Sequence, residues 1–439
     1  MADKKLSRRE MLGRASLAAG GLVIGGAGGL LIGDQTAAGS SGGVGAGRSS
    51  AGPIKVAGVF PLTGVVAADG AEMRNGTVMA IDEINAAGGL LGRKLEYIEV
   101  DDQDSSSDQI TSAFRRVVDQ IKPHVAFSGY HLATGPQFDI VADAEQLYYE
   151  LGTATAWVKL YKSNPKRYWC IFQGDPTEAW YGVGLARWMD EQVTNKTVPN
   201  TAKRAGILTA DDAYDASIAD HYKAEAEALG WTVARVERFT AGKVTDWGPL
   251  LSKFRDDDIS FLFTATFSTP DNAAMIQEFA QSPLNAVLYQ QYGPSVPEYL
   301  DLTGDVANGV VWSTVLGRIP DERGKAWIEA YETKFNTSPG WANAPGNYDL
   351  VMLWAAAVRE VGDPSDFKAI AAATEKLTMR GVTGSHTMVD HAGVQYPYQN
   401  GDASLGQPQL IVQVQEGQQQ VIFPSPYTTA EFQVPSWVR

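Results

Sequence analysis

Cysteine is almost absent from this chain, whose 439 residues contain a single one, Cys170. Cys170 lies in the apolar segment 168–172, where a lone cysteine usually behaves as a small buried hydrophobic residue. A nucleophilic cysteine needs a base beside it, and the sequence indicates none. We therefore expect Cys170 to belong to the core.

Motifs of enzymes and metal sites are also missing. The histidines show no metal-ligand spacing, and neither a Gly-x-Ser-x-Gly elbow nor a Gly-x-x-x-x-Gly-Lys loop occurs. Asp102, Asp104, Ser106 and Asp108 stand at alternating positions as in a calcium loop. Ser107 and Ala113 replace the required glycine and acid, which favours a solvated turn. We expect no metal, no cofactor and no enzyme activity. The histidines are His124, His131, His221, His386 and His391.

Positive charge is scarce. The chain has 36 Lys and Arg against 51 Asp and Glu, a net charge of -15. Residues 1–50 hold six of these bases and three of the acids, so the remainder carries about -18. This balance argues against nucleic acid and against anionic membrane surfaces as partners.

The N-terminus departs from this acidic character. Arg8 and Arg9 precede a weakly apolar stretch, residues 17–32, that is rich in Gly and Ala. Paired arginines before such a stretch are typical of a twin-arginine signal, which the twin-arginine translocase reads. A basic tail or a membrane anchor are the alternatives, although the stretch is short for a bilayer span.

A flexible linker is expected after the apolar stretch, because residues 34–53 are rich in Gly, Ser and Ala. No cysteine comes directly after the apolar stretch, so a lipid anchor is not expected. We interpret residues 1–50 as signal peptide and linker, and we predict a periplasmic or extracytoplasmic protein. The remaining chain suits two domains by length.

Apolar strands alternate with amphipathic helices along the rest of the chain. Residues 55–60 form a predicted strand, a helix with apolar spacings of three and four follows, and residues 95–100 form the next strand. The same plan recurs at residues 124–129, 204–210 and 259–266. Continuous apolar strands alternating with helices predict an α/β fold with parallel sheets, built twice over.

Several segments of the first unit resemble one family. They are residues 56–60, the triplet 62–64, residues 79–89, residues 91–93 and the acidic pair 101–102. Together they resemble the opening of branched-chain amino acid type extracytoplasmic solute-binding proteins, over about residues 55–390. The resemblance implies the type I periplasmic binding protein fold, in which two α/β lobes are joined by a hinge.

The resemblance also implies domain boundaries, because the chain of this family crosses between the lobes three times. We expect the N-terminal lobe to comprise residues 54–172 plus 314–382. The C-terminal lobe would comprise residues 173–313 plus 383–439.

Candidate ligand-binding residues of the first lobe follow from the resemblance. Relatives hold a ligand carboxylate with hydroxyls and backbone N–H groups in two loops. The matching positions are Tyr130 and His131, then Thr153 and Thr155. His131 departs from the small hydroxyl residue usual there, so a structural role in its loop and a ligand contact both stay open.

In the second lobe the resemblance implies aromatic contacts at Tyr214, Phe267 and Tyr292. The acid that pairs with a ligand ammonium in amino acid binders is missing, because the sequence around residue 292 reads Gln-Gln-Tyr-Gly. Asp69 stands where relatives place an apolar or aromatic side chain. An unpaired ammonium would be costly to desolvate, so an ordinary aliphatic amino acid is a doubtful ligand.

The resemblance implies a monomeric receptor that captures a small polar organic solute, amino acid-like, amide or carboxylate, and delivers it to the permease of an ABC transporter. An alternative is a receptor for urea or a short-chain amide. Asp69 and the two glutamines that precede Tyr292, Gln290 and Gln291, would suit such a ligand by pairing with its N–H and C=O groups. A sensory ligand-binding subunit and an exported enzyme remain further alternatives. The sequence does not name the ligand.

Overall fold

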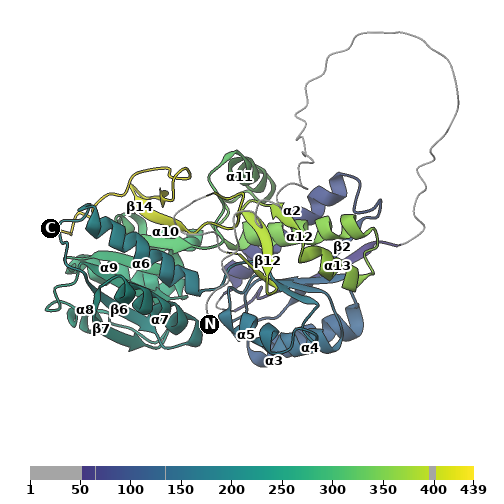
Figure 1. Ribbon diagram of the computed structural model, residues 1–439, viewed down its shortest axis with the longest axis horizontal. Helices are drawn as coiled ribbons and strands as arrows, with labels where there is room; N and C mark the ends of the chain where they lie inside the picture. Colours follow the sequence, from purple (N-terminus) through teal and green to yellow (C-terminus); the bar gives the residue numbers. More distant parts are fainter. Residues whose placement is uncertain (1–51, 65, 134, 395–401) are drawn as a thin grey trace, which may run out of the picture.

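The computed structural model describes residues 52–64, 66–133, 135–394 and 402–439. Two sheets lie side by side along the long axis of the molecule, each with its own helices (Figure 1). We call each sheet with the helices packed on it a lobe. No helix in the described ranges is long and apolar enough to cross a membrane. The predicted signal and linker fall outside these ranges.

The first lobe is built on an eight-stranded sheet of order β11-β12-β13-β5-β4-β3-β1-β2. Strands β1 to β5 run parallel to their neighbours, whereas β11, β12 and β13 pair antiparallel to one another. The strands are β1 (Ile54–Phe60), β2 (Leu95–Asp101), β3 (Val125–Ser128), β4 (Tyr148–Glu150), β5 (Ile171–Gln173), β11 (Thr378–Arg380), β12 (Ser385–Val389) and β13 (Ala392–Gly393).

Helices from two stretches of the chain belong to this lobe. They are α2 (Ala67–Ala86), α3 (Ser107–Arg116), the π-helical turn η1 (Val117–Ile121), α4 (Pro136–Asp143), α5 (Thr155–Ser163), α11 (Glu322–Phe335), α12 (Asn343–Val361) and α13 (Phe367–Thr374). Helix α2 packs closely on α12, and a Cβ at Gly76 would collide with the carbonyl of Ala344. This close approach brings the first turns of both helices to the same place.

The second lobe is built on a seven-stranded sheet of order β15-β14-β10-β9-β8-β6-β7. Strands β6 to β10 are parallel, and β14 and β15 add antiparallel strands at one edge. The strands are β6 (Arg204–Ala210), β7 (Thr232–Phe239), β8 (Phe261–Thr266), β9 (Val287–Tyr292), β10 (Val311–Thr314), β14 (Leu410–Gln415) and β15 (Gln418–Phe423).

The helices of the second lobe are α6 (Ala179–Thr194), α7 (Ala213–Ala228), α8 (Gly248–Ser252), α9 (Thr269–Gln281) and α10 (Pro297–Thr303), with 3-10 turns η2 (Gly293–Ser295) and η3 (Gly304–Ala307). Asp212 caps α7 by accepting hydrogen bonds from the N–H groups of Tyr214 and Asp215. This cap holds the first turn of α7, where Tyr214 lies, in a fixed position.

One boundary differs from the sequence prediction. Residues from 383 onward were expected in the second lobe, but β12 and β13 join the first sheet, where Ala392 pairs with Gln173 of β5. The backbone bond from Gly393 N to Asp175 O continues this pairing. The prediction is wrong for these strands because they complete the edge of the first sheet beside β5.

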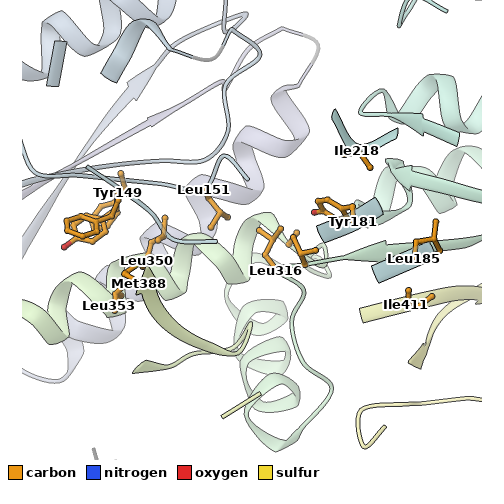
Figure 2. Packing of buried hydrophobic residues seen from close by; sticks show 14 of the residues in the cluster. Tyr149, Leu151, Tyr181, Leu185, Ile218, Leu316, Leu350, Leu353, Met388 and Ile411 are labelled. Atoms are coloured by element: carbon orange, nitrogen blue, oxygen red, sulfur yellow. The ribbon is translucent and has the colours of Figure 1, made fainter. Parts of the chain in front are cut away.

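The apolar core continues from one lobe into the other. One buried cluster contains Leu151 and Leu350 of the first lobe, Leu316 between the lobes, and Tyr181 and Leu185 of the second, as Figure 2 shows. Cys170 is fully buried in a second cluster, as predicted, and its Sγ faces the carbonyl of Val141 at 3.8 Å.

Candidate functional site

Asp69 is the centre of a group of polar side chains that spans both lobes. Its Oδ2 accepts a hydrogen bond from the hydroxyl of Tyr130 at 2.8 Å. Its Oδ1 accepts bonds from the hydroxyl of Tyr292 at 3.0 Å and from the amide of Asn343 at 2.7 Å. The rings of Tyr130 and Tyr292 meet edge to face, with centroids 6.0 Å apart. Three of the predicted site residues therefore contact one another directly.

Four different elements position this group. Asp69 lies in the first turn of α2, Tyr130 follows β3, Tyr292 ends β9 of the second lobe, and Asn343 begins α12. Tyr292 has a positive φ of 64°, which is unusual for a bulky residue and is often found at functional sites. Such a constrained backbone directs the tyrosine side chain across the junction toward Asp69.

Sequence reasoning missed Asn343, whose amide also donates to the hydroxyl of Tyr292 at 3.2 Å. The side chain is buried, with 4% of its surface exposed. The sequence offered one signal: this polar residue begins a helix with an almost continuous apolar pattern. A polar residue that is buried in such a helix needs a hydrogen-bond partner.

Burial controls the charge of this group. It raises the pKa of Asp69 to about 6, an effect that the three hydrogen bonds oppose and that the nearby acid Glu298 reinforces. Burial also raises the pKa values of Tyr130 and Tyr292 well above that of free tyrosine, so both hydroxyls remain protonated donors. At neutral pH Asp69 is a mostly ionised carboxylate held by neutral donors.

The loop after β4 faces the segment that leads into α6. The N–H of Thr153 donates to Asp175 Oδ2 at 3.0 Å, and the N–H of Ala154 donates to Gln173 Oε1 at 2.7 Å. The N–H and the hydroxyl of Thr155 both donate to Glu178 Oε2, at 2.5 and 2.7 Å. The donors that were predicted to hold a ligand carboxylate are thus bonded to acceptors of this protein.

Glu178 connects the two lobes. Besides its bonds to Thr155, its second oxygen accepts a bond from Ser217 of α7 at 2.7 Å. Its backbone N–H donates to the carbonyl of Thr153 at 2.7 Å. The side chain is 5% exposed, so these bonds form away from water. This role of Glu178 was not predicted from the sequence, because a glutamate just before a helix usually acts only as a first-turn acid.

Tyr214 and Phe267 lie at the second-lobe side of the same junction. The hydroxyl of Thr153 donates to the hydroxyl of Tyr214 at 3.4 Å, another hydrogen bond between the lobes. The N–H of Phe267 donates to Asp215 Oδ2 at 3.0 Å. Asp215 is fully buried, and burial raises its pKa well above the ordinary value.

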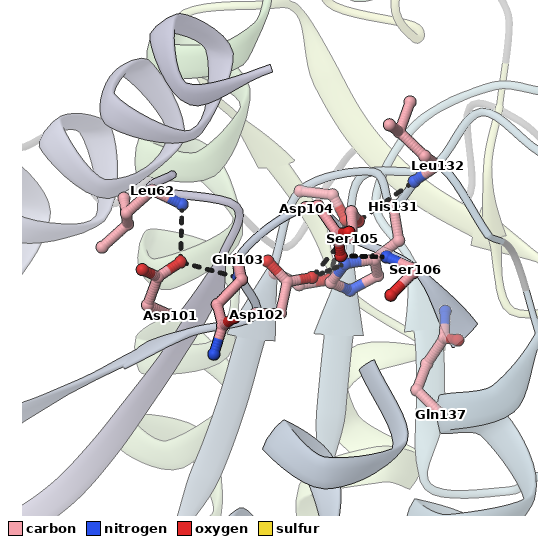
Figure 3. A network of polar contacts seen from close by, with 12 residues as sticks. Leu62, Asp101, Asp102, Gln103, Asp104, Ser105, Ser106, His131, Leu132 and Gln137 are labelled. Carbon is pink, nitrogen blue, oxygen red and sulfur yellow. Dashed lines mark hydrogen bonds and ion pairs between the residues drawn. The ribbon is translucent and has the colours of Figure 1, made fainter. Parts of the chain in front are cut away.

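His131 is directed elsewhere, into the interior of the first lobe. Its Nδ1 lies 2.6 Å from Asp102 Oδ2 (Figure 3). Its ring meets that of Phe114 edge to face. Ser105 also donates to Asp102 and accepts a bond from the N–H of Leu132. These contacts favour the structural role for His131 over the ligand contact.

The two glutamines next to Tyr292 belong to the second lobe's own core. Gln290 accepts a bond from Tyr299 at 2.6 Å and donates to the carbonyl of Asn272 at 2.9 Å. Gln291 accepts a bond from Tyr289. Both side chains are fully buried. Because both ends of the Gln290 amide are engaged, its suggested pairing with a urea or amide ligand gains no support.

The segments that cross between the lobes are tied together by His386. Its Nδ1 lies 3.0 Å from the carbonyl of Gly174 in the first crossing, and its Nε2 lies 3.1 Å from Asp349 of α12. Asp349 also accepts bonds from the N–H groups of Val382 and Thr383, each at 2.8 Å. The hinge region therefore has a buried polar anchor.

Two lobes built on mostly parallel sheets, with polar side chains that meet across their junction, define a two-lobed binding protein of the type I periplasmic fold. A family model described as periplasmic binding protein matches residues 53–415, and the chain belongs to this family. The predicted resemblance and the predicted fold class are thereby confirmed.

Relatives point to one branch of the family. The leucine-, isoleucine-, valine-, threonine- and alanine-binding protein of Pseudomonas aeruginosa is 27% identical over 335 residues, which cover 76% of this chain and 84% of the relative. A solved protein of Silicibacter pomeroyi, named for branched-chain amino acid ABC transport, is 32% identical with a TM-score of 0.82, covering 88% of this chain and all of that one. The isoleucine complex of a Streptococcus pneumoniae binding protein has a TM-score of 0.70 at 20% identity, covers 85% of this chain and all of that one, and supports the fold alone.

Proposed function

We propose that this protein is the substrate-binding receptor of an ABC uptake transporter and captures a small polar organic solute between its lobes. The observation that carries the proposal is the hydrogen bond between Asp69 of the first lobe and Tyr292 of the second. Ligands of two-lobed receptors bind where polar groups of both lobes converge, and this group is such a place.

Closure by hinge motion follows from the same contacts. Ligand entry requires the lobes to separate, which breaks the bonds from Asp69 to Tyr292 and from Thr153 to Tyr214. A ligand that contacts both sides favours the closed state by the difference in its affinity for the two states. The closed form is then what the permease subunits in the membrane recognise.

The proposed ligand-facing residues are Asp69, Tyr130, Thr153, Tyr214, Phe267 and Tyr292, with Asn343 added. Thr155 acts instead through Glu178, and His131 supports its loop. The proposed lobes keep the predicted boundaries, apart from the strands β12 and β13. The proposed receptor is a monomer, not an enzyme.

Export remains a proposal based on the sequence. Arg8 and Arg9, followed by a weakly apolar stretch, support export by the twin-arginine translocase to the periplasm or cell exterior. Lysine does not reproduce the planar guanidinium group, so replacing both arginines by lysine should retain the precursor in the cytoplasm. Normal export of that double variant, measured by fractionation, would contradict the proposal.

Leucine, isoleucine and valine should bind weakly, because the acid expected to pair with their ammonium is absent beside Tyr292. We expect dissociation constants above about 100 μM, whereas a typical receptor ligand binds near 1 μM, a gap of about 2.7 kcal/mol. Isothermal titration calorimetry measures this directly. Tight leucine binding that also survives Asp69→Ala would show that both positions are misassigned.

A further inference from the structure

Acidic side chains dominate the junction between the lobes. Five acids there have exposed fractions of at most 8%: Asp69, Glu150, Asp175, Glu178 and Asp215. The charged neighbours that most affect Asp69, Asp175 and Asp215 are other acids. The nearby base Arg318 instead opposes the rise that burial causes in the pKa of Glu72. Its guanidinium carbon lies over the Trp341 ring, 4.3 Å from the ring centroid.

Hydrogen bonds satisfy these acids only in part. Oδ1 of Asp175 and Oδ1 of Asp215 have no hydrogen-bond partner among the described residues. The other carboxylate oxygen of each accepts a bond from the backbone of a candidate site residue, Thr153 and Phe267 respectively. A buried carboxyl oxygen without a partner has capacity for a further hydrogen bond.

An anionic ligand group finds no donor in the loops that the family resemblance suggested. The N–H groups of residues 153–155 and the hydroxyl of Thr155 donate to Asp175, Gln173 and Glu178. Tyr130 donates to Asp69. A ligand carboxylate would have to displace these acceptors and lie near the buried carboxylate of Asp69, which is strongly unfavourable.

A cationic group meets the opposite situation. Asp69 Oδ2 accepts one bond, from Tyr130, so it can accept another, and an ammonium would replace a neutral contact by a charge-assisted one. The rings of Tyr130 and Tyr292 lie beside Asp69, and aromatic rings attract cations. Charge and hydrogen-bonding capacity therefore favour the same kind of ligand.

We propose that the ligand is a small organic cation that carries N–H donors and lacks a carboxylate, and that Asp69 meets its charge. This inference rests on the proposed receptor function and narrows its ligand class. It also accounts for the replacement of the expected apolar or aromatic residue by Asp69.

The test is a binding screen of the purified chain with four sets of compounds that share short carbon skeletons. The sets are primary amines, amides, carboxylates and amino acids, such as isopentylamine, isovaleramide, isovalerate and leucine. Thermal shift ranks the sets, and calorimetry measures the dissociation constant of the best compound. We expect an amine to bind most tightly.

Variants test whether the carboxylate of Asp69 pairs with the charge of the ligand. Asp69→Asn keeps the shape but removes the charge, and it should weaken amine binding at least about 30-fold, as expected when one partner of a buried charge pair is lost. Asp119→Asn removes an exposed acid of the same lobe and should bind like the wild type. Tyr292→Phe keeps the charge and should weaken binding less than Asp69→Asn.

The outcomes separate the two proposals. If a carboxylate or an amino acid binds most tightly, or if Asp69→Asn binds the amine as well as the wild type, the cation inference is wrong while the receptor function stands. If no compound of any set binds, the receptor function itself is contradicted.

Discussion

Replacing Asp349 by alanine should lower the free energy of unfolding by about 3 to 5 kcal/mol, because it leaves several buried partners without an acceptor. The carboxylate accepts bonds from the N–H groups of Val382 and Thr383, from the hydroxyl of Thr383 and from His386. All of these groups are buried, so water does not replace the lost acceptor.

The pH dependence of this loss is set by the Asp349 pKa. Burial alone would raise it, but the bonds from His386, Thr383 and Val382 outweigh burial and hold the pKa below the ordinary value. A depressed pKa stabilises the folded state above about pH 4, and this contribution is lost as the pH falls through the folded-state pKa. The difference between wild type and Asp349→Ala should therefore shrink in strong acid.

Chemical denaturation at neutral pH and in acid measures both effects. Glu360→Ala is the matched control, since Glu360 is an exposed acid of the same helix and should change stability by less than about 0.5 kcal/mol. A loss below about 1 kcal/mol for Asp349→Ala would contradict the role of this residue as the anchor of the hinge.

Replacing Glu178 by alanine should weaken ligand binding about 10- to 100-fold. The closed state loses three hydrogen bonds at the junction between the lobes, and each such bond is worth about 1 kcal/mol or more when it is buried. The bonds come from the N–H and hydroxyl of Thr155 in the first lobe and from Ser217 in the second. The open state does not contain the inter-lobe bonds, so the variant shifts the equilibrium toward opening.

Calorimetry gives the affinity, and small-angle X-ray scattering gives the compactness of the ligand-free protein. We expect Glu178→Ala to be less compact than the wild type and Glu178→Gln, which keeps one acceptor oxygen, to be intermediate. Glu227→Ala removes an exposed acid of α7 and serves as the control. Unchanged affinity and compactness in Glu178→Ala would exclude it from the closing contacts.

Hydrophobic periodicity was sufficient to predict the two parallel sheets. Strands such as β1 and β8 are continuous apolar runs followed by amphipathic helices, and this pattern has few other structural solutions. Strands β12 and β13 were misassigned because β12 pairs with β13, and β13 pairs with β5, which lies more than 200 residues earlier in the sequence. Local sequence patterns do not show which strands pair when they lie so far apart in the sequence.

Residues that depart from the family pattern were the part of the candidate site that the sequence could predict. Asp69 and Tyr292 were singled out for such departures, and they form a direct hydrogen bond. Asn343 and Glu178 were missed because their importance arises from contacts with residues far away in the sequence. For Thr155, the family pattern indicated a ligand contact, whereas its hydroxyl contacts Glu178 of this chain.

Native mass spectrometry tests the central claim most directly. The purified chain is incubated with the pooled amines, amides, carboxylates and amino acids, and the mass of the intact complex is measured. We expect one small solute per chain on the wild type and none on Asp69→Ala, whose site lacks the central carboxylate. A wild-type chain that binds no solute, or an equal adduct on Asp69→Ala, would contradict capture of a solute by the Asp69 site.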